Sequence, residues 1–204
     1  MMREDDAAAP SVAPLPLTGR RVLIGVTGAI AAAALPPGLA LARLAMGLDR
    51  PRFILTHGGA QLVTPKALAA TSGGEVFSQA SDHSGDSRVL HVELAEWADV
   101  VVVMPATANL LSRLAAGAAD DLLTSVLLAT SAPVIVAPSM NHVMWTKPSV
   151  QRNVKQLIDD GIHIIEPAPS FKASDGTFAG EAMPPVAAVL NTVADILDSL
   201  RSDG

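Results

Sequence analysis

The sequence predicts an α/β protein built on one parallel, doubly wound sheet with helices on both faces. Short runs of β-branched residues alternate along the chain with longer segments of helical periodicity. Strands that are apolar on both sides are typical of a sheet buried between two helical layers. Two of these runs end in a proline, small residues and an asparagine, at Pro105–Asn109 and Pro138–Asn141. Because parallel α/β sheets form their sites where strands end, these two segments indicate a pocket.

Five strands are predicted, and each is followed within two residues by Gly or Pro, which end a strand. In chain order they are Arg21–Val26, Arg52–Thr56, Val100–Met104, Pro133–Ala137 and His163–Ile165, with a further short strand possible at Val89–Val92. Helical patterns lie between them, at about 38–47, 59–71, 107–117, 120–130, 148–160 and 185–201. Pro36 and Pro37 precede the first helix, so that helix starts late or kinks there. Asp120 and Asp121 are typical of a helix N-terminal cap.

Composition limits the possible partners. The 204 residues carry a net charge of −6 and no basic run, which argues against nucleic acid and an anionic membrane as partners. The chain has no cysteine and only scattered histidines, so we expect no metal site. Half of the residues are hydrophobic and the mean hydropathy is +0.38, yet no apolar run is long enough to span a membrane. Burial of apolar surface in a homo-oligomer would account for this excess, the alternative being a large, Ala-rich core.

One domain is expected over residues 20–204. Residues 1–19 are rich in Ala, Pro and Asp and predict a disordered lead. They show no cationic start followed by an apolar core, so a cytoplasmic location is expected. Residues 167–184, rich in Gly, Ser and Ala, predict a loop that acts as a lid, the alternative being a surface loop without function.

The segment Gly25–Ile30 follows the first strand and precedes a helix. Glycines at such a turn let the backbone close around a phosphate, and the pattern is not the G-x-G-x-x-G of dinucleotide sites. Thr56 and the two following glycines offer a second wall for that phosphate. The alternatives are an ordinary turn at Gly28 and a capping role for Thr56.

Polar residues near the two later strand ends complete the candidate site. His91 precedes the strand at Val100, and an imidazole acts as a base near neutral pH, although a lone His is more often structural. Thr107 and Asn109 follow that strand, although Thr107 could equally cap a helix. Asn141 follows the next strand, and its amide suits a carboxylate.

These motifs resemble the flavin-containing cysteine decarboxylase family, which includes phosphopantothenoylcysteine decarboxylases and the peptidyl-cysteine decarboxylases of lanthipeptide-type pathways. The similarity covers about residues 20–200 and occurs in order. Its elements are G-V-T-G-A-I-A at 25–31, H-V-E-L-A-E-W-A-D at 91–99, P-A-T-A-N at 105–109, A-D-D-L-L-T at 119–124 and A-P-S-M-N-H-V-M-W at 137–145.

The resemblance implies a Rossmann-like, flavodoxin-type three-layer sandwich that forms trimers or dodecamers, with FMN at a subunit interface. It makes His91 the catalytic base and places the substrate carboxylate on Asn141. The cofactor residues that it implies are Gly28, Ala29, Ile30, Thr56, Thr107, Ala108, Asn109 and Ser139. Further substrate contacts are implied at Met140, Ser174, Gly176, Phe178 and Met183. The family's reaction removes two electrons and CO₂ from a cysteine and leaves an ene-thiol.

The lid distinguishes the two branches of this family. The coenzyme A branch carries a Cys there that protonates the ene-thiol, whereas residues 173–183 and the rest of this chain contain none. Ser174, Gly176, Phe178 and Met183-Pro184 are similar to the peptidyl branch, whose ene-thiol closes an aminovinyl-cysteine ring. Two departures bear on FMN affinity: Ala29 replaces the usual Ser beside the phosphate, and Leu110 replaces the usual Thr.

The sequence therefore predicts oxidative decarboxylation of the C-terminal cysteine of a precursor peptide in the biosynthesis of a ribosomal peptide natural product. Two alternatives stay open. The first is a phosphopantothenoylcysteine decarboxylase of coenzyme A biosynthesis with a replaced acid. The second is a non-catalytic flavin-binding or regulatory subunit, since a fold alone does not determine function.

Overall fold

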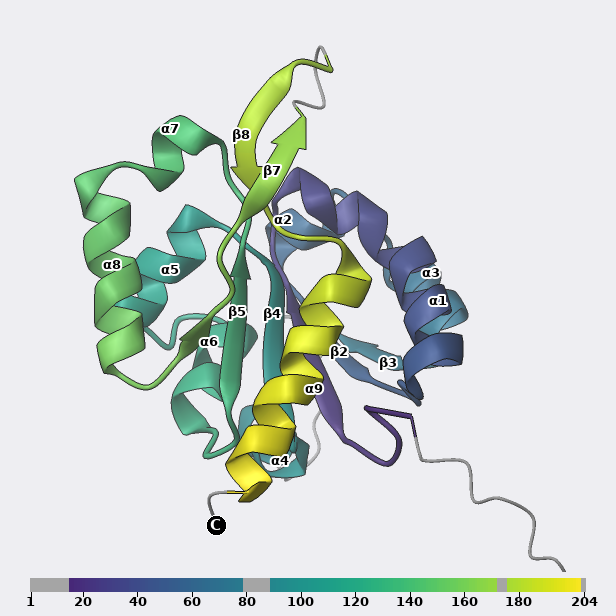
Figure 1. The fold of residues 1–204 in the computed structure, drawn as a ribbon. Coiled ribbons are helices and arrows are strands. Elements are labelled where there is room, and N and C mark those ends of the chain that lie inside the picture. The colour runs from purple at the N-terminus through teal and green to yellow at the C-terminus, as the bar shows by residue number, and fades with distance from the viewer. Residues whose placement is uncertain (1–14, 79–88, 172–175, 203–204) are drawn as a thin grey trace, which may run out of the picture.

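A six-stranded parallel sheet forms the centre of the molecule. The computed structural model describes residues 15–78, 89–171 and 176–202, with the backbone alone at 169–171 and 178–181. The strand order is β3-β2-β1-β4-β5-β6 (Figure 1). The strands are β1 (Val22–Val26), β2 (Arg52–Leu55), β3 (Glu75–Phe77), β4 (Val100–Ala106), β5 (Val134–Pro138) and β6 (His163–Ile164). This is the Rossmann order, in which the crossover direction reverses between β1 and β4.

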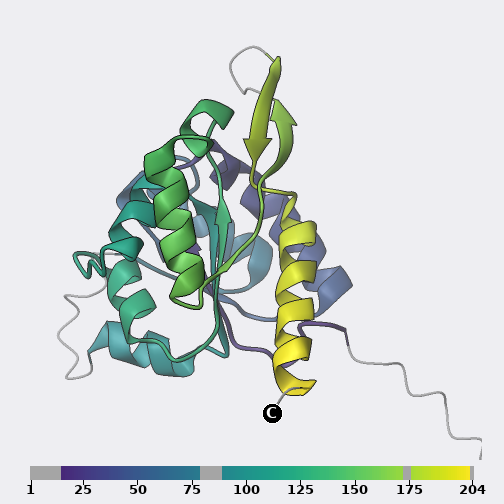
Figure 2. The same cartoon turned by 60° about the vertical axis from the view of Figure 1, so that its left-hand side comes forward.

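Helices cover both faces of the sheet, which makes the three layers that were predicted (Figures 1 and 2). One face carries the 3₁₀ helix η1 (Ile30–Ala34), α1 (Leu35–Met46), α3 (Pro65–Ser72) and α9 (Val186–Ser202). The other carries α4 (Leu90–Trp97), α5 (Ala108–Ala115), α6 (Leu122–Ala129) and α8 (Pro148–Asp159). Two short helices, α2 (His57–Ala60) and α7 (His142–Trp145), lie at the carboxyl-terminal edge of the sheet.

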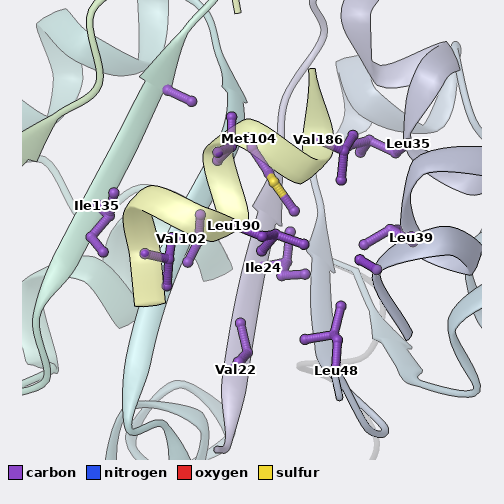
Figure 3. Close-up of a cluster of buried hydrophobic side chains, with 14 of the residues drawn as sticks. Val22, Ile24, Leu35, Leu39, Leu48, Val102, Met104, Ile135, Val186 and Leu190 are labelled. Atoms are coloured by element: carbon purple, nitrogen blue, oxygen red, sulfur yellow. The ribbon is translucent and has the colours of Figure 1, made fainter. Parts of the chain in front are cut away.

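The core is divided in two by the sheet. Side chains of β1 alternate between the layers, so that Val22 and Ile24 face α1 and α9 while Leu23 faces the opposite helices. Figure 3 shows Leu190 of α9 lying over Ile24 and Val102 of the central strands. Strands buried on both faces explain the continuous Val and Ile runs of the sequence.

The first helix does not start late: α1 begins at Leu35, before the expected range of 38–47, and the two prolines lie inside it instead of preceding it. Pro36 and Pro37 occupy its first turn, where no amide donor is needed. The chain between β1 and this helix forms η1. Gly47, with a φ of +70°, ends α1 in the left-handed conformation that glycine adopts most readily.

Two expectations need correction here. Val89–Val92 is not a strand, because Leu90, Leu94 and Trp97 recur at helical spacing and pack on the core as part of α4. Leu17, which we placed in the disordered lead, is fully buried, and its amide donates to the Met46 carbonyl at 2.8 Å. Residues 1–14 of that lead lie outside the described residues.

Two further elements were not predicted. β3 is a three-residue, half-buried edge strand without a clear alternation. The expected lid loop contains an antiparallel pair, β7 (Ala168–Phe171) and β8 (Phe178–Ala182), which projects beyond the carboxyl-terminal edge of the sheet (Figure 2). Whether this hairpin acts as a lid stays a prediction.

Within residues 15–78, 89–171 and 176–202, no helix is both long and apolar enough to cross a membrane. The same ranges contain no group of three His, Cys, Asp or Glu side chains arranged to hold a metal ion.

An ion pair joins the starts of β1 and β4. Asp99 accepts hydrogen bonds from Arg21 Nη2 at 2.7 Å, from Nε at 3.1 Å and from the Arg21 amide at 2.8 Å. Partial burial alone would raise the pKa of Asp99, but these hydrogen bonds outweigh it and hold the pKa below its ordinary value.

We expect Asp99→Asn to lower the free energy of unfolding by about 1 kcal/mol at neutral pH, since the pair is half-exposed and screened by water. A carboxyl whose pKa is depressed by folding contributes above its unfolded pKa of about 3.9, and that contribution is lost as pH falls through the folded pKa. Urea denaturation at pH 7 and pH 3 measures the difference. Asp195→Asn, an exposed site on α9, is the control, and an equal loss at both pH values would contradict the assignment.

We expect Leu190→Ala to lower the free energy of unfolding by about 2–5 kcal/mol, because it leaves a cavity between α9 and the sheet. Leu200→Ala is the matched control on the same helix, where the side chain is 46% exposed. Chemical denaturation of both variants tests the packing, and similar losses in the two would contradict it.

Candidate active site

Most of the predicted cofactor residues directly follow the carboxyl ends of β1 and β4. The two strands are neighbours in the sheet, but their chains continue to helices on opposite faces. In open α/β sheets this reversal leaves a crevice beyond the carboxyl ends of the strands, where ligands bind.

Thr27 ties the two strand ends together. Its hydroxyl donates to the Pro105 carbonyl at 2.7 Å and accepts from the Thr107 amide at 3.0 Å, and the side chain is 3% exposed. The Thr27 amide also bonds to the Pro105 carbonyl, at 3.3 Å. We did not single out Thr27 from the sequence, although its place directly after the first strand was a usable signal. It holds the loop after β1 beside the loop after β4.

A close backbone contact joins the loops after β1 and β2. A Cβ on Gly28 would lie 3.0 Å from the backbone of Gly58, so the two glycines permit an approach that larger residues would hinder. The Thr56 hydroxyl donates to the Val26 carbonyl at 3.1 Å and accepts from the Gly59 amide at 3.2 Å, which caps α2. The capping role considered for Thr56 is therefore confirmed, and the segments at Gly28 and Thr56 are adjacent, as predicted.

Ala29 and Ile30 lead into the 3₁₀ helix at this edge. Ala29 occupies the N-cap position of η1, with no side-chain hydrogen bond to the helix and 9% exposure. A Ser at this position could supply a hydroxyl that Ala lacks. Ile30 is 62% exposed and therefore presents an apolar surface beside the crevice.

The turn after β4 carries Thr107, Ala108 and Asn109. Thr107 caps α5 by accepting from the Leu110 amide at 3.3 Å, as its alternative role predicted. Ala108 is half-buried and Asn109 is exposed. Leu110, which replaces the usual Thr of the family, is 2% exposed and packs in the core.

The end of β5 brings Ser139, Met140 and Asn141 to the same edge. Ser139 is buried, and its amide donates to the Ala106 carbonyl at 2.8 Å, which links it to β4. Asn141 is exposed and caps α7, because its Oδ1 accepts from the Met144 amide at 2.9 Å. This contact uses the amide oxygen and leaves the Nδ2 hydrogens for a ligand.

The hairpin lies beside the Asn141 segment, since β8 contacts α7. Phe178 begins β8, Gly176 lies in the turn with a φ of +69°, and Met183 packs partly buried on the core after the hairpin. Ser174 lies outside the described residues.

His91 lies apart from all of these residues. It is the half-buried second residue of α4, a helix that ends just before β4 starts and lies at the opposite, amino-terminal edge of the sheet (Figure 1). Glu93 on the same helix lies 3.6 Å from Arg52 Nη1, at the start of β2. Within one copy of the chain, the structure therefore separates His91 from Asn141.

The motif at 119–124 has a structural role. Asp121 caps α6 in a reciprocal arrangement with Thr124, as predicted, while Asp120 pairs with Arg113 instead. The hydrogen bond from Arg113 lowers the pKa of Asp120. Arg113 also bonds to Asp121 at 2.8 Å, so this motif joins α5 to α6.

Comparisons with known proteins agree with this architecture. The coenzyme A biosynthesis bifunctional protein CoaBC of Vibrio cholerae is 36% identical over 170 residues, which are 83% of this chain and 42% of that protein. This chain thus spans less than half the length of that relative. Among solved structures, the FMN-dependent cysteine decarboxylase SpaF has a TM-score of 0.74 and 36% identity, covering 90% of this chain and 98% of that one. A PPC decarboxylase variant complexed with pantothenoylaminoethenethiol has a TM-score of 0.79 and 29% identity, covering 88% and 98%.

The family model described as Flavoprotein matches residues 11–198, nearly the whole chain. The match includes every strand of the sheet and all the residues of the crevice. Together with the similar structures, it shows that this chain belongs to the Flavoprotein family.

Proposed function

We propose that this protein is an FMN-dependent decarboxylase acting on the C-terminal cysteine of a precursor peptide. The observation that carries the proposal is the polar carboxyl-terminal edge, where the Gly28–Gly58 contact, Thr107 and the Asn141 amide lie around one crevice. The reaction class also agrees with the similarity to SpaF, an FMN-dependent cysteine decarboxylase.

The residues at this edge suit a flavin mononucleotide. Glycine backbone at Gly28 and Gly58 can approach a phosphate closely, and small side chains at Ala29 and Ala108 leave room for a flat ring. Bound there, FMN would accept the two electrons of the oxidation. With Ala29 in place of Ser, backbone amides and the neighbouring threonines would have to hold the phosphate.

His91 and Asn141 would divide the work on the substrate. Asn141 Nδ2 donates to the carboxylate of the terminal cysteine and so orients it, while α7 holds the amide in place through its cap. His91 takes the proton of the cysteine thiol. Loss of two electrons from the Cα–Cβ–S unit then lets the carboxylate leave as CO₂, and an ene-thiol remains.

The proposal of a peptide substrate rests on the sequence of residues 173–183. In the coenzyme A branch, a Cys in this segment protonates the ene-thiol so that the product is reduced. No Cys is present here, and Gly176, Phe178 and Met183 are similar to the peptidyl branch, in which the ene-thiol is released. The product would then add to a dehydroamino acid in an aminovinyl-cysteine ring.

The site is completed between copies of the chain. His91 and Asn141 lie at opposite edges of one copy, so a reaction that uses both needs His91 from one copy and Asn141 from another. Exposed apolar side chains flank both residues: Val89 and Val92 around His91, and Val143 and Met144 beyond Asn141. Burial of these side chains would stabilise the homo-oligomer, a trimer or a dodecamer.

We expect short peptides ending in Cys to lose about 46 Da, the mass of CO₂ and two hydrogens, after incubation with the FMN-loaded protein. Mass spectrometry measures the loss, and a peptide of the same sequence ending in Ser is the control because it has no thiol to oxidise. FMN binding without peptide turnover, together with turnover of phosphopantothenoylcysteine, would replace this proposal by the coenzyme A reaction. The similarity to CoaBC makes that reaction the second candidate.

We expect His91→Asn and Asn141→Asp each to abolish turnover while FMN stays bound. Asp keeps the acceptor that caps α7 but repels the substrate carboxylate. Co-expression of the two variants should restore about a quarter of the sites, because random pairing joins an intact His91 to an intact Asn141 that often. No recovery in mixed oligomers would refute a site shared between copies, and turnover by His91→Asn alone would refute its role as base.

A further inference from the structure

A second hollow lies at the amino-terminal edge of the sheet, away from the crevice. Its volume is about 620 Å³, and three arginines line it: Arg43 from α1, Arg50 from the loop after α1 and Arg52 from the start of β2. Trp97 at the end of α4 and the turn Gly73–Glu75 form the remaining wall. The hollow therefore joins three segments that are distant in the sequence.

Arg52 is held in position but is not fully paired. Its guanidinium lies 4.5 Å from the centre of the Trp97 ring and 5.7 Å from that of Phe77. Glu75 and Glu93 lie 3.5 and 3.6 Å from its nitrogens, yet the buried Nη1 makes no hydrogen bond to the residues that the structure describes. The two glutamates and the aromatic rings therefore hold the guanidinium of Arg52 as a fixed part of the wall.

Arg43 and Arg50 are exposed and have no carboxylate partner in the described part of the chain. Arg50 has a φ of +42°, a conformation that non-glycine residues rarely adopt. Arg43 lies against Gly73, where a Cβ would come within 3.1 Å of its Nη1. Glycine at this position thus leaves room for the guanidinium.

The charge of the hollow is opposite to that of the protein. Three arginines and Glu75 give its lining a formal charge of +2, and Glu93 beside Arg52 lowers the local charge to +1, whereas the whole chain carries −6. Planar guanidinium groups bind phosphate through paired hydrogen bonds, and a doubly charged anion suits several such groups better than a single carboxylate does.

We propose that this hollow is a binding site for a small phosphate-bearing anion. Arg43 and Arg50 would supply the free donors, and Arg52, held between Trp97 and the two glutamates, would add positive charge to the wall of the hollow. This proposal does not depend on the chemistry of the crevice, because the hollow and the crevice share no residue and lie at opposite edges of the sheet within one copy.

The test is isothermal titration of the full chain with inorganic phosphate and, separately, with glycerol 3-phosphate, at constant ionic strength because exposed charges are screened by salt. We expect saturable binding that the double variant Arg43→Gln, Arg50→Gln weakens by about tenfold or more. Arg152→Gln, an exposed arginine on α8 outside the hollow, is the control and should bind as the original protein does. Both altered residues are exposed, so folding should be retained, and circular dichroism checks it.

The two probes distinguish the source of the phosphate: tighter binding of the ester indicates a phosphorylated metabolite, and equal binding indicates the free ion. Any phosphate bound at the crevice would be unaffected by the double variant. The proposal is overturned if neither probe binds, or if the double variant binds as well as the control. It is also overturned if a Glu-rich peptide binds at these arginines while phosphate does not, since the surface would then serve a protein partner.

Discussion

The hydrogen bonds of the Thr27 hydroxyl are the interaction on which the candidate site depends. β1 and β4 are neighbours in the sheet but lead to opposite helical layers, so nothing in their connections keeps the two following loops together. Thr27 spans that gap by donating to Pro105 and accepting from Thr107. Since Thr27 and Pro105 are buried, loss of the bond between them would leave an unpaired polar group inside the protein.

Helix capping and ligand binding use the same residues at this edge. Thr56, Thr107 and Asn141 each cap the helix that follows a strand, so each side chain is held by its own backbone. A cap consumes one oxygen lone pair and leaves the rest of the group available, as Asn141 illustrates with its free Nδ2. Each of these residues can therefore cap a helix and bind a ligand at the same time. A rigid side chain also needs less ordering when a substrate binds.

The functional side chains are divided between the two edges of the sheet. Asn141 lies at the carboxyl-terminal edge, whereas His91 and the three arginines of the hollow lie toward the amino-terminal edge. α4 connects both of these features, because it carries His91 near its start and Trp97 at its end. Any contact between copies that brings α4 to another crevice would place the hollow near that interface. The exposed apolar residues around His91 and Asn141 give such a contact its driving force.

The sequence by itself determined the parallel α/β class and the edge at which the crevice forms, because β-branched runs ending in Gly or Pro are local signals. It also identified the capping at Thr56, Thr107 and Asp121. It missed β3, which is short and half-buried, and the hairpin, whose Gly- and Ser-rich segment predicts a loop. Only the tertiary structure decided that Thr27 meets Thr107, that His91 lies away from Asn141, and that Arg43, Arg50 and Arg52 surround one hollow. These outcomes follow from strand order and from helix packing, which join residues far apart in the chain and leave no periodic trace in the sequence.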